Sequence, residues 1–325
     1  MNRGTRLTVL GSLNMDISVT VPRLPGPGMT VLGGGASYAP GGKGANQAVA
    51  ASRLGGAVRM IGCVGDDDFG GRLRLALGDE GVADEGVRAV PGTPTGLAMI
   101  TVDAAGENMI TVAPGANREA GPEEIAAVRA AAADVLVISA EIPVAVIRAA
   151  LAASGPALRV LNLAPAPPEA AELVAAGVDW LVVNEPEAAA VLGRKAAGRG
   201  GEAGRGELAG ETQPGQRRLA GAAAAAAELA AMGANHAVVT AGAAGAAYHG
   251  PGPDAVTVPG YQVRAVDSVG AGDTFVGALA VALAAGIPPG EAVRAASAAT
   301  RPGTQSAMPR PADILAATGL PWPVS

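Results

Sequence analysis

Aromatic residues, cysteine and histidine are scarce in this chain of 325 residues. Two Trp, three Tyr and two Phe make up only 2% of it, so a core has to be built from Ala, Val, Leu and Ile. The single cysteine, Cys63, excludes an internal disulfide and a cysteine metal cluster. The two histidines, His236 and His249, are too few for a histidine-based zinc site. Apolar residues, in contrast, make up 49% of the chain, which suffices for a substantial core.

Basic charge and long apolar runs are also lacking. The net charge is −6 and the pI is about 5.1. Because no basic stripe runs through the motif regions, we expect no nucleic-acid partner. No apolar stretch approaches the roughly 20 residues that cross a bilayer, and Met1 to Arg6 lead directly into a strand-like run without a signal peptide. These features predict a soluble cytoplasmic protein with no membrane partner.

Apolar runs with strand character alternate with Ala-rich stretches of helical character. The strand-like runs are apolar throughout, as in parallel strands buried on both faces, and they lie at residues 7–10, 58–63, 134–139, 160–163, 180–183 and 237–240. The helical stretches lie at residues 44–54, 122–133, 144–153, 186–192 and 219–232. This order predicts one three-layer α/β/α domain over residues 1–325, with a mostly parallel sheet.

Three segments interrupt this alternation. Segments 15–38 and 95–112 hold alternating strand-like runs at 17–21, 30–33, 96–102 and 108–112, the last two joined by a turn-rich link. We expect them to form a small antiparallel β sheet inserted into the main domain, which serves as a lid or an oligomer interface. Residues 194–218 are Gly-rich and charged without apolar periodicity, which predicts a flexible surface loop.

The sequence Gly270-Ala-Gly-Asp273 carries the sharpest chemical signal. It precedes the amphipathic stretch 274–285, so its amides are expected at the start of a helix, where free N–H groups and the helix dipole bind anions. Gly270 and Gly272 let a ligand approach these amides closely. An acid here suits phosphoryl transfer, with Asp273 taking the proton of an acceptor hydroxyl. By spacing alone, a simple N-cap role for Asp273 is an equally good interpretation.

A second Gly-rich segment, Pro40-Gly-Gly-Lys-Gly-Ala-Asn-Gln47, leads into the helical stretch 44–54. It is not a Walker A loop, because Ser37 stands at the first Gly position and Gly44 stands where Ser or Thr should follow the lysine. Lys43 and Asn46 are suited to bind the hydroxyl groups of a polar ligand. Taken alone, the segment is better explained as a Gly-rich helix entry with a surface lysine.

Polar residues follow three further strand-like runs, at the ends where ligands of open α/β sheets bind. They are Asn14 with Asp16, Asn184 with Glu187, and the turn Thr240-Ala-Gly-Ala-Ala-Gly245. The first pair suits sugar hydroxyls, the second suits magnesium-bound phosphate through water, and the turn suits a nucleotide phosphate. The competing interpretations are an Asx-rich strand end, a helix capping box and a generic turn.

Taken together and in this order, the five motifs resemble the ribokinase-like (pfkB) carbohydrate kinase family over nearly the whole chain. The runs at 41–48 and 270–275 are jointly the most specific. The resemblance implies ATP-dependent phosphorylation of a small sugar, with Asp273 as catalytic base and Gly270, Ala271 and Gly272 as anion hole. It implies sugar contacts at Asn14, Asp16, Gly42, Lys43, Asn46, Glu141 and Asp273. It implies ATP and Mg²⁺ contacts at Asn184, Glu187, Thr240, Gly242, Gly245, Gly272 and Ser297, and K⁺ ligands at Asp267, Val269, Arg301 and Gly303.

The resemblance also implies that the two β segments form a lid and a homodimer interface. The chain departs from the family in a longer segment 194–218 and in missing residues between Ser297 and Thr300, which amount to more than one helical turn. In the family that helix borders the adenine pocket and leads to cation ligands, so the shortening bears on the K⁺ site and on Ser297.

Segment 41–47 favours ribose, phosphorylated at O5, as the acceptor. Deoxyribose, fructose, adenosine and inosine remain alternatives, because pocket shape decides between small polyols. A sugar-binding protein that has lost catalysis is an alternative of another class, although a pure binder would need neither Asp273 nor the anion-hole glycines.

Overall fold

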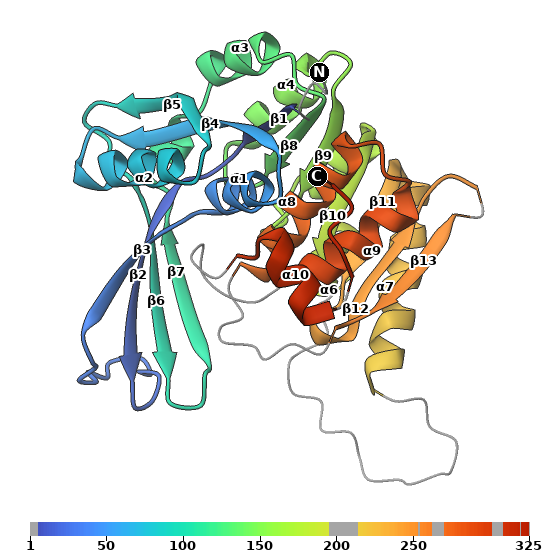
Figure 1. The fold of residues 1–325 in the computed structure, drawn as a ribbon. Helices are drawn as coiled ribbons and strands as arrows, with labels where there is room; N and C mark the ends of the chain where they lie inside the picture. Colours follow the sequence, from blue (N-terminus) through green and yellow to red (C-terminus); the bar gives the residue numbers. More distant parts are fainter. Residues whose placement is uncertain are drawn as a thin grey trace, which may run out of the picture.

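A computed structural model describes residues 6–194, 214–252, 254–261, 270–300, 308–318 and 320–324. Within these residues nine strands form the larger sheet, in the order β13-β12-β11-β10-β9-β8-β1-β4-β5 (Figure 1). They are β1 (Arg6–Leu10), β4 (Ala57–Gly65), β5 (Ala83–Val90), β8 (Val135–Ser139), β9 (Leu158–Asn162), β10 (Val178–Asn184), β11 (Ala234–Thr240), β12 (Gly245–His249) and β13 (Ala255–Pro259).

The larger sheet is parallel from β5 to β11, and only β12 and β13 are antiparallel. Its central strands carry continuous apolar runs because helices cover both faces. Every residue of β8 is buried, for example. The predicted mostly parallel sheet is therefore confirmed, with an antiparallel hairpin added at one edge.

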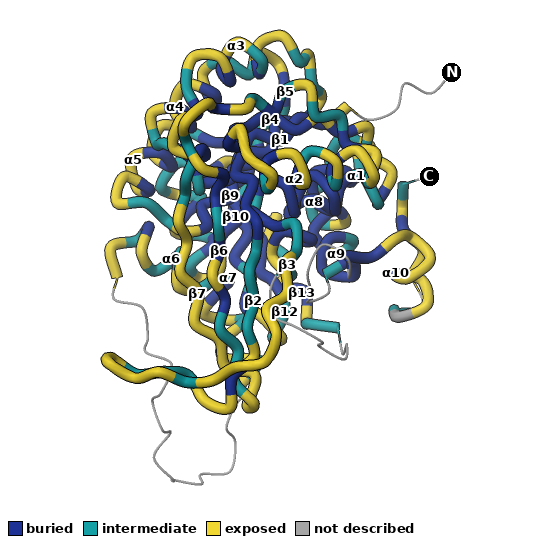
Figure 2. The backbone as a smooth tube through the Cα atoms, turned by 90° about the vertical axis from the view of Figure 1, so that its left-hand side faces the viewer, coloured by how far each residue is buried: buried dark blue, intermediate teal, exposed yellow. Residues whose placement is uncertain are grey.

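Helices pack on both faces of the larger sheet, which makes three layers (Figures 1 and 2). One face is covered by α1 (Lys43–Arg53), α2 (Asp68–Asp79), α8 (Ala271–Ala284), α9 (Pro289–Ala299) and α10 (Pro311–Thr318). The other is covered by α3 (Pro122–Ala130), α4 (Val144–Ala153), α5 (Ala170–Ala175), α6 (Glu185–Val191) and α7 (Pro214–Met232). Among the described residues, no helix combines the length and apolarity that crossing a bilayer requires.

Four strands of the described chain form a second, smaller sheet that projects from one side of the molecule (Figure 1). They are β2 (Asn14–Val21), β3 (Ala36–Gly41), β6 (Gly96–Asp103) and β7 (Asn108–Ala113). The pairs β3–β2 and β6–β7 are antiparallel, whereas the central pair β2–β6 is parallel. The small inserted sheet is thus confirmed, with one parallel pairing that the sequence pattern does not predict.

The strand predicted at residues 30–33 is wrong. These residues lie in a loop, and the strand that pairs with β2 comes later, at β3. Residues 33–35 are three successive glycines, which have no side chains to pack on a sheet and lose the most entropy when ordered.

The register of the small sheet decides which side chains face the larger sheet. Asp16 pairs with Ala98, and Ile100 pairs with Ile110, so these residues share one face. Because side chains alternate along a strand, Asn14 lies on the same face as Asp16.

The segment 194–218 falls mostly outside the described residues. Residues 195–213 are among those not described, whereas 214–218 form the first turns of α7. Arg194, at the near end of the segment, donates from Nη2 to Glu228 Oε2 at 2.6 Å. The helix predicted at 219–232 therefore begins earlier, at Pro214.

Candidate active site

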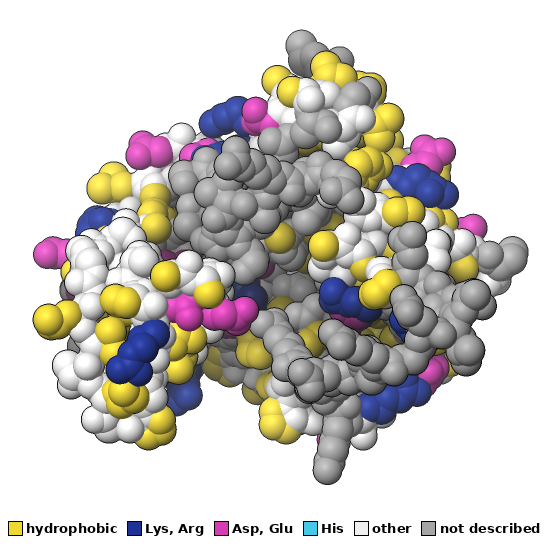
Figure 3. All heavy atoms as spheres, turned by 90° about the horizontal axis from the view of Figure 1, so that it is seen from below, with side chains coloured by type: hydrophobic (Ala, Val, Ile, Leu, Met, Phe, Trp, Pro, Cys, Tyr) yellow, Lys and Arg dark blue, Asp and Glu magenta, His cyan; other side chains and the backbone are white. Residues whose placement is uncertain are grey.

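A cavity of about 1160 Å³ lies between the small sheet and the carboxyl ends of the central strands. Figure 3 shows the molecule hollowed on this face, with acidic and basic side chains beside the hollow. Strand ends supply part of the wall: Asn162 ends β9, Asn184 ends β10 and Thr240 ends β11. The small sheet supplies the opposite wall through β2, β6 and β7. This is the position where open α/β sheets bind their ligands.

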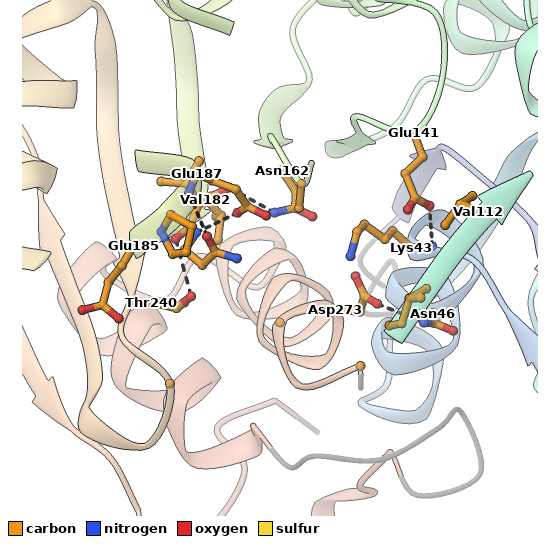
Figure 4. A pocket seen from close by; sticks show the side chains of 18 of the residues that line it. Lys43, Asn46, Val112, Glu141, Asn162, Val182, Glu185, Glu187, Thr240 and Asp273 are labelled. Carbon is orange, nitrogen blue, oxygen red and sulfur yellow. Dashed lines mark hydrogen bonds between the residues drawn. The ribbon is translucent and has the colours of Figure 1, made fainter. Parts of the chain in front are cut away.

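The cavity has two chemically different ends. Figure 4 shows Lys43, Asn46 and Asp273 together at one end and Glu187, Glu185 and Thr240 at the other. Helix α8 lies between them, with Asp273 in its first turn.

Asp273 sits where α8 begins, but it does not cap the helix. The N-cap is Gly270, with a left-handed φ of 79° that suits glycine, and no side chain in the described structure caps this end. The first amides of the helix therefore have no side-chain cap, and Gly270 and Gly272 at this end line the cavity. The N-cap interpretation of Asp273 is wrong.

The Asp273 carboxylate is instead held by amide side chains of α1. Asn46 Nδ2 donates to Asp273 Oδ2 at 2.9 Å, and Gln47 Nε2 donates to Asp273 Oδ1 at 3.0 Å. Asp273 is only 6% exposed, and what remains exposed faces the cavity. The carboxylate is thus fixed in orientation and is open to a hydroxyl group that enters the cavity.

Lys43 is the cation nearest to this carboxylate end. The charge of Asp273 is the main reason that the pKa of Lys43 lies above its ordinary value, against an opposing effect of burial. Smaller contributions come from Glu141, Glu187 and Asp16. Lys43 therefore stays protonated throughout the neutral range and balances the carboxylates around it.

Two further polar side chains at this end, those of Glu141 and Asn14, are also fixed by hydrogen bonds. Ser12 Oγ donates to Glu141 Oε2 at 2.5 Å, and Asn117 Nδ2 donates to Asn14 Oδ1 at 2.8 Å. Gly42 has a φ of 89°, and a Cβ there would lie 2.6 Å from the amide nitrogen of Asn14. Only glycine lets the Lys43 segment approach β2 this closely.

At the opposite end, Asn184 and Glu187 form a capping box at the start of α6. Asn184 Oδ1 accepts from the Glu187 amide at 2.9 Å, and Glu187 Oε2 accepts from the Asn184 amide at 2.8 Å. Burial raises the pKa of Glu187 above its ordinary value, against the opposing effects of its hydrogen bond to Asn184 and the charge of Lys43. Both residues also line the cavity, so capping and ligand binding are compatible here.

The model of the pfkB family of carbohydrate kinases matches residues 5–310 of this chain. The chain belongs to the pfkB carbohydrate kinase family. A ribokinase from Schizosaccharomyces pombe is 35% identical over 293 residues, 87% of this chain and 86% of its own. A deoxyribokinase from Salmonella typhimurium is 33% identical over 278 residues, 84% of each chain. The family resemblance drawn from the five motifs is confirmed.

A solved structure supports the same family fold. The structure of Arabidopsis thaliana ribokinase complexed with ribose and ATP is similar with a TM-score of 0.78 and 28% identity, over 96% of this chain and 98% of that one. The fold of this chain is therefore similar to that of a solved ribokinase over nearly its whole length.

Most residues that the family pattern predicts as site residues meet in the one cavity. They are Asn14, Asp16, Gly42, Lys43, Asn46, Glu141, Asn184, Glu187, Thr240, Gly242, Gly270, Gly272 and Asp273. Among the described residues, Ala271, Gly245 and Ser297 are outside its lining. Gly245 has a packing role, since a Cβ there would overlap the Val258 carbonyl oxygen. The predicted K⁺ ligands Asp267, Val269, Arg301 and Gly303 lie outside the described residues.

Further polar residues belong to the site, although no role for them follows from the motifs. Gln47 holds Asp273, Asn162 lines the cavity, and Arg218 forms an ion pair with Glu185 in the cavity wall. Asn162 leaves a signal in the sequence, because it is a polar residue within an apolar strand run, near the end where ligands bind. Arg218 leaves none, because it lies in a charged segment without a motif.

Proposed function

We propose that this kinase transfers the γ-phosphate of ATP to O5 of D-ribose, giving ribose 5-phosphate and ADP. The observation that carries the proposal is the position of the Asp273 carboxylate. It lies in the first turn of α8, lines the cavity and is oriented by two amide donors. The similarity to ribokinases favours ribose among the possible acceptors. Because ATP is the proposed donor, the proposed compartment is the cytoplasm.

Acceptor binding is assigned to the end of the cavity that holds Lys43. Asn14, Asp16, Lys43, Asn46 and Glu141 line this end. Carboxylates accept from sugar hydroxyls, while the Lys43 ammonium and the Asn46 amide donate to them. Asn46 also donates to Asp273, so a sugar bound there has its hydroxymethyl group beside the carboxylate.

In the transfer step Asp273 accepts the proton of the O5 hydroxyl. The oxygen then forms a bond to the γ-phosphorus as the bond from that phosphorus to the β–γ bridging oxygen breaks, and ADP leaves. The backbone amides of Gly270, Ala271 and Gly272 face the transferred group and stabilise its negative charge. The small sheet acts as the proposed lid, and its closure excludes the water that would otherwise hydrolyse ATP.

Two metal ions belong to the proposal. Asn184 and Glu187 would hold magnesium-bound phosphate through water, because carboxylate and amide oxygens, such as those of these two residues in the cavity lining, are ligands that a hard cation prefers. Magnesium supplies charge neutralisation on the ATP phosphates when bound. A K⁺ site at Asp267, Val269, Arg301 and Gly303 stays a prediction, as does an adenine contact of Ser297.

The small sheet is also the proposed interface of a homodimer. On the face turned away from the cavity, Met99 is 60% and Met109 49% exposed. The edge strand β7 is exposed along its length, so a second copy of this chain would cover its unpaired edge and these apolar side chains. Sedimentation should show a dimer for the native protein and a monomer for Met109→Lys. Leu75→Lys, at an exposed position of α2, is the control that should remain dimeric; a monomeric native protein would refute the interface.

A coupled assay of ATP consumption tests the acceptor. Ribose, 2-deoxyribose, fructose, adenosine and inosine are compared with Mg²⁺, with and without K⁺. The proposal requires the highest kcat/KM on ribose and a product that carries phosphate at C5. The similar deoxyribokinase makes 2-deoxyribose the second candidate, and a higher kcat/KM on that sugar would replace ribose in the proposal. Ribose binding without turnover of any acceptor would instead indicate a sugar-binding protein.

A further inference from the structure

Gln47 is a fully buried polar side chain directly beneath the proposed catalytic base. It lies on α1, is 0% exposed and does not line the cavity. Its Nε2 donates twice, to Asp273 Oδ1 at 3.0 Å and to Asn162 Oδ1 at 2.9 Å. One amide group therefore joins the start of α8 to the end of β9.

The hydrogen bonds continue from Gln47 into the larger sheet. Asn162 Nδ2 donates to the Val182 carbonyl oxygen of β10 at 3.0 Å. An unbroken chain of hydrogen bonds thus runs from the Asp273 carboxylate through two amide side chains to the backbone of the central sheet. Pairing with β9 and β11 holds the backbone of β10 in the sheet, so this chain of hydrogen bonds fixes the carboxylate relative to the sheet.

The orientation of the Gln47 amide follows from its neighbours. If the amide were turned over, Oε1 would face the Asp273 carboxylate and the Asn162 carbonyl oxygen, and both contacts would be repulsive. In the observed orientation Oε1 is instead buried, with no hydrogen-bond partner in the described part of the chain. A buried acceptor without a partner lowers stability. A polar group held at such a cost points to a role in function.

We propose that Gln47 is a positioning residue for Asp273 and that Asn162 supports it. This inference rests on the proposed role of Asp273 as the base. Asn46 and Gln47, the two donors to the carboxylate, have different roles. Asn46 reaches it from the cavity lining and is proposed to contact the sugar, whereas Gln47 reaches it from the core and touches no ligand. Gln47 sets the direction in which the carboxylate presents its lone pairs to the acceptor hydroxyl.

The first test replaces Gln47 by Met, which has a similar length but donates no hydrogen bond. We expect kcat with ribose and ATP to fall about 10- to 100-fold, because small misplacements of a reacting group have effects of this size. KM for ribose should change less than about threefold, because Gln47 does not touch the sugar site. Because the variant leaves the Oδ1 atoms of Asn162 and Asp273 without this donor, the urea midpoint should also fall. The kcat is therefore measured under conditions in which urea denaturation shows the variant to be fully folded.

Thr8→Val is the control, because Thr8 is a buried polar residue of β1 in the larger sheet and does not line the cavity. It should leave kcat unchanged. A Gln47→Met variant that is folded and has native kcat overturns the inference. A fall in kcat that is fully accounted for by the unfolded fraction of the variant also overturns it, because that result describes a structural residue.

The second test uses Gln47→Glu and remains decisive if Gln47→Met does not fold. The introduced carboxyl repels Asp273 when ionised and donates to it when protonated. Its kcat, divided by the native kcat, should therefore rise as the pH is lowered from about 8.5 to about 6, since burial beside another carboxylate favours the protonated form. A flat ratio overturns the inference.

Asn162→Ala completes the test of the hydrogen-bond chain. If Asn162 acts through Gln47, the loss in kcat of Gln47→Met combined with Asn162→Ala should be smaller than the product of the two single losses. Fully multiplicative losses overturn the supporting role of Asn162. The two proposals fail differently: native kcat in Asp273→Asn overturns the base itself, whereas an inactive Asp273→Asn with a fully active Gln47→Met overturns only the positioning role.

Discussion

Replacing Asp273 by Asn changes one atom of the site and removes the proposed base. The native carboxylate accepts from Asn46 at 2.9 Å and from Gln47 at 3.0 Å. Because both partners are donors, the new amide can satisfy only one of them, and its NH₂ group faces the other. The variant thus loses a base and one hydrogen bond while keeping the volume and position of the side chain.

The expected size of each effect follows from these contacts. A general base contributes about 10²–10⁴-fold to the rate, equivalent to about 3–5 kcal/mol of transition-state stabilisation. The opposed amide donors cost about 1–3 kcal/mol of stability, the range for a buried group without its partner. Ribose affinity should change far less, because Asn14, Asp16, Lys43 and Glu141 remain in the cavity lining.

The assay measures kcat by coupled ADP formation with saturating ribose and MgATP, and the affinity for ribose by calorimetry. We expect kcat to fall by at least about 100-fold while the dissociation constant of ribose changes less than about tenfold. Urea denaturation of the variant shows that it is folded at the assay temperature. A kcat within about threefold of the native value would refute Asp273 as the base, because removal of a general base should lower the rate far more than this.

Three further results are expected. Because the pKa of Lys43 is raised above its ordinary 10.5, the stabilisation that its charge provides is complete below pH 10.5 and is lost as the pH rises further. In a plot of melting temperature against pH, Lys43→Met should therefore show a shallower fall above pH 10.5. An unchanged slope would contradict the assigned charge interactions. Gly42→Ala should lower the free energy of unfolding by at least about 1–3 kcal/mol, from positive φ and overlap with Asn14, and a native urea midpoint would be inconsistent with the described backbone. Glu187→Gln should raise the Mg²⁺ concentration for half-maximal activity about 10- to 100-fold; Mg²⁺ titration of ATP consumption checks this, and an unchanged midpoint would separate Glu187 from the metal.

The sequence pattern predicts elements with a clear local signal, whether they are buried throughout, as β8 is, or exposed, as β7 is. The strand β8 and the helix α4 are apolar enough on their own to be recognised. The strand β5 is not predicted, because it lies at the sheet edge and its residues are only partly buried. The central parallel pair β2–β6 is also not predictable from local pattern, since 74 residues separate Val21 from Gly96 by number and no turn specifies their pairing.

The sequence by itself determined the kinds of chemistry and their place on the chain. Asp273 after Gly270-Ala-Gly272, Lys43 within a Gly-rich helix entry, and polar residues at strand ends are visible locally, because turn geometry and helix starts depend on neighbouring residues. Only the tertiary structure decided that Asp273 does not cap its helix and that Gln47 and Asn162 hold it. These contacts join residues that are 115 and 226 positions apart in the sequence. Only the packing of α1 and α8 on the sheet brings such residues together.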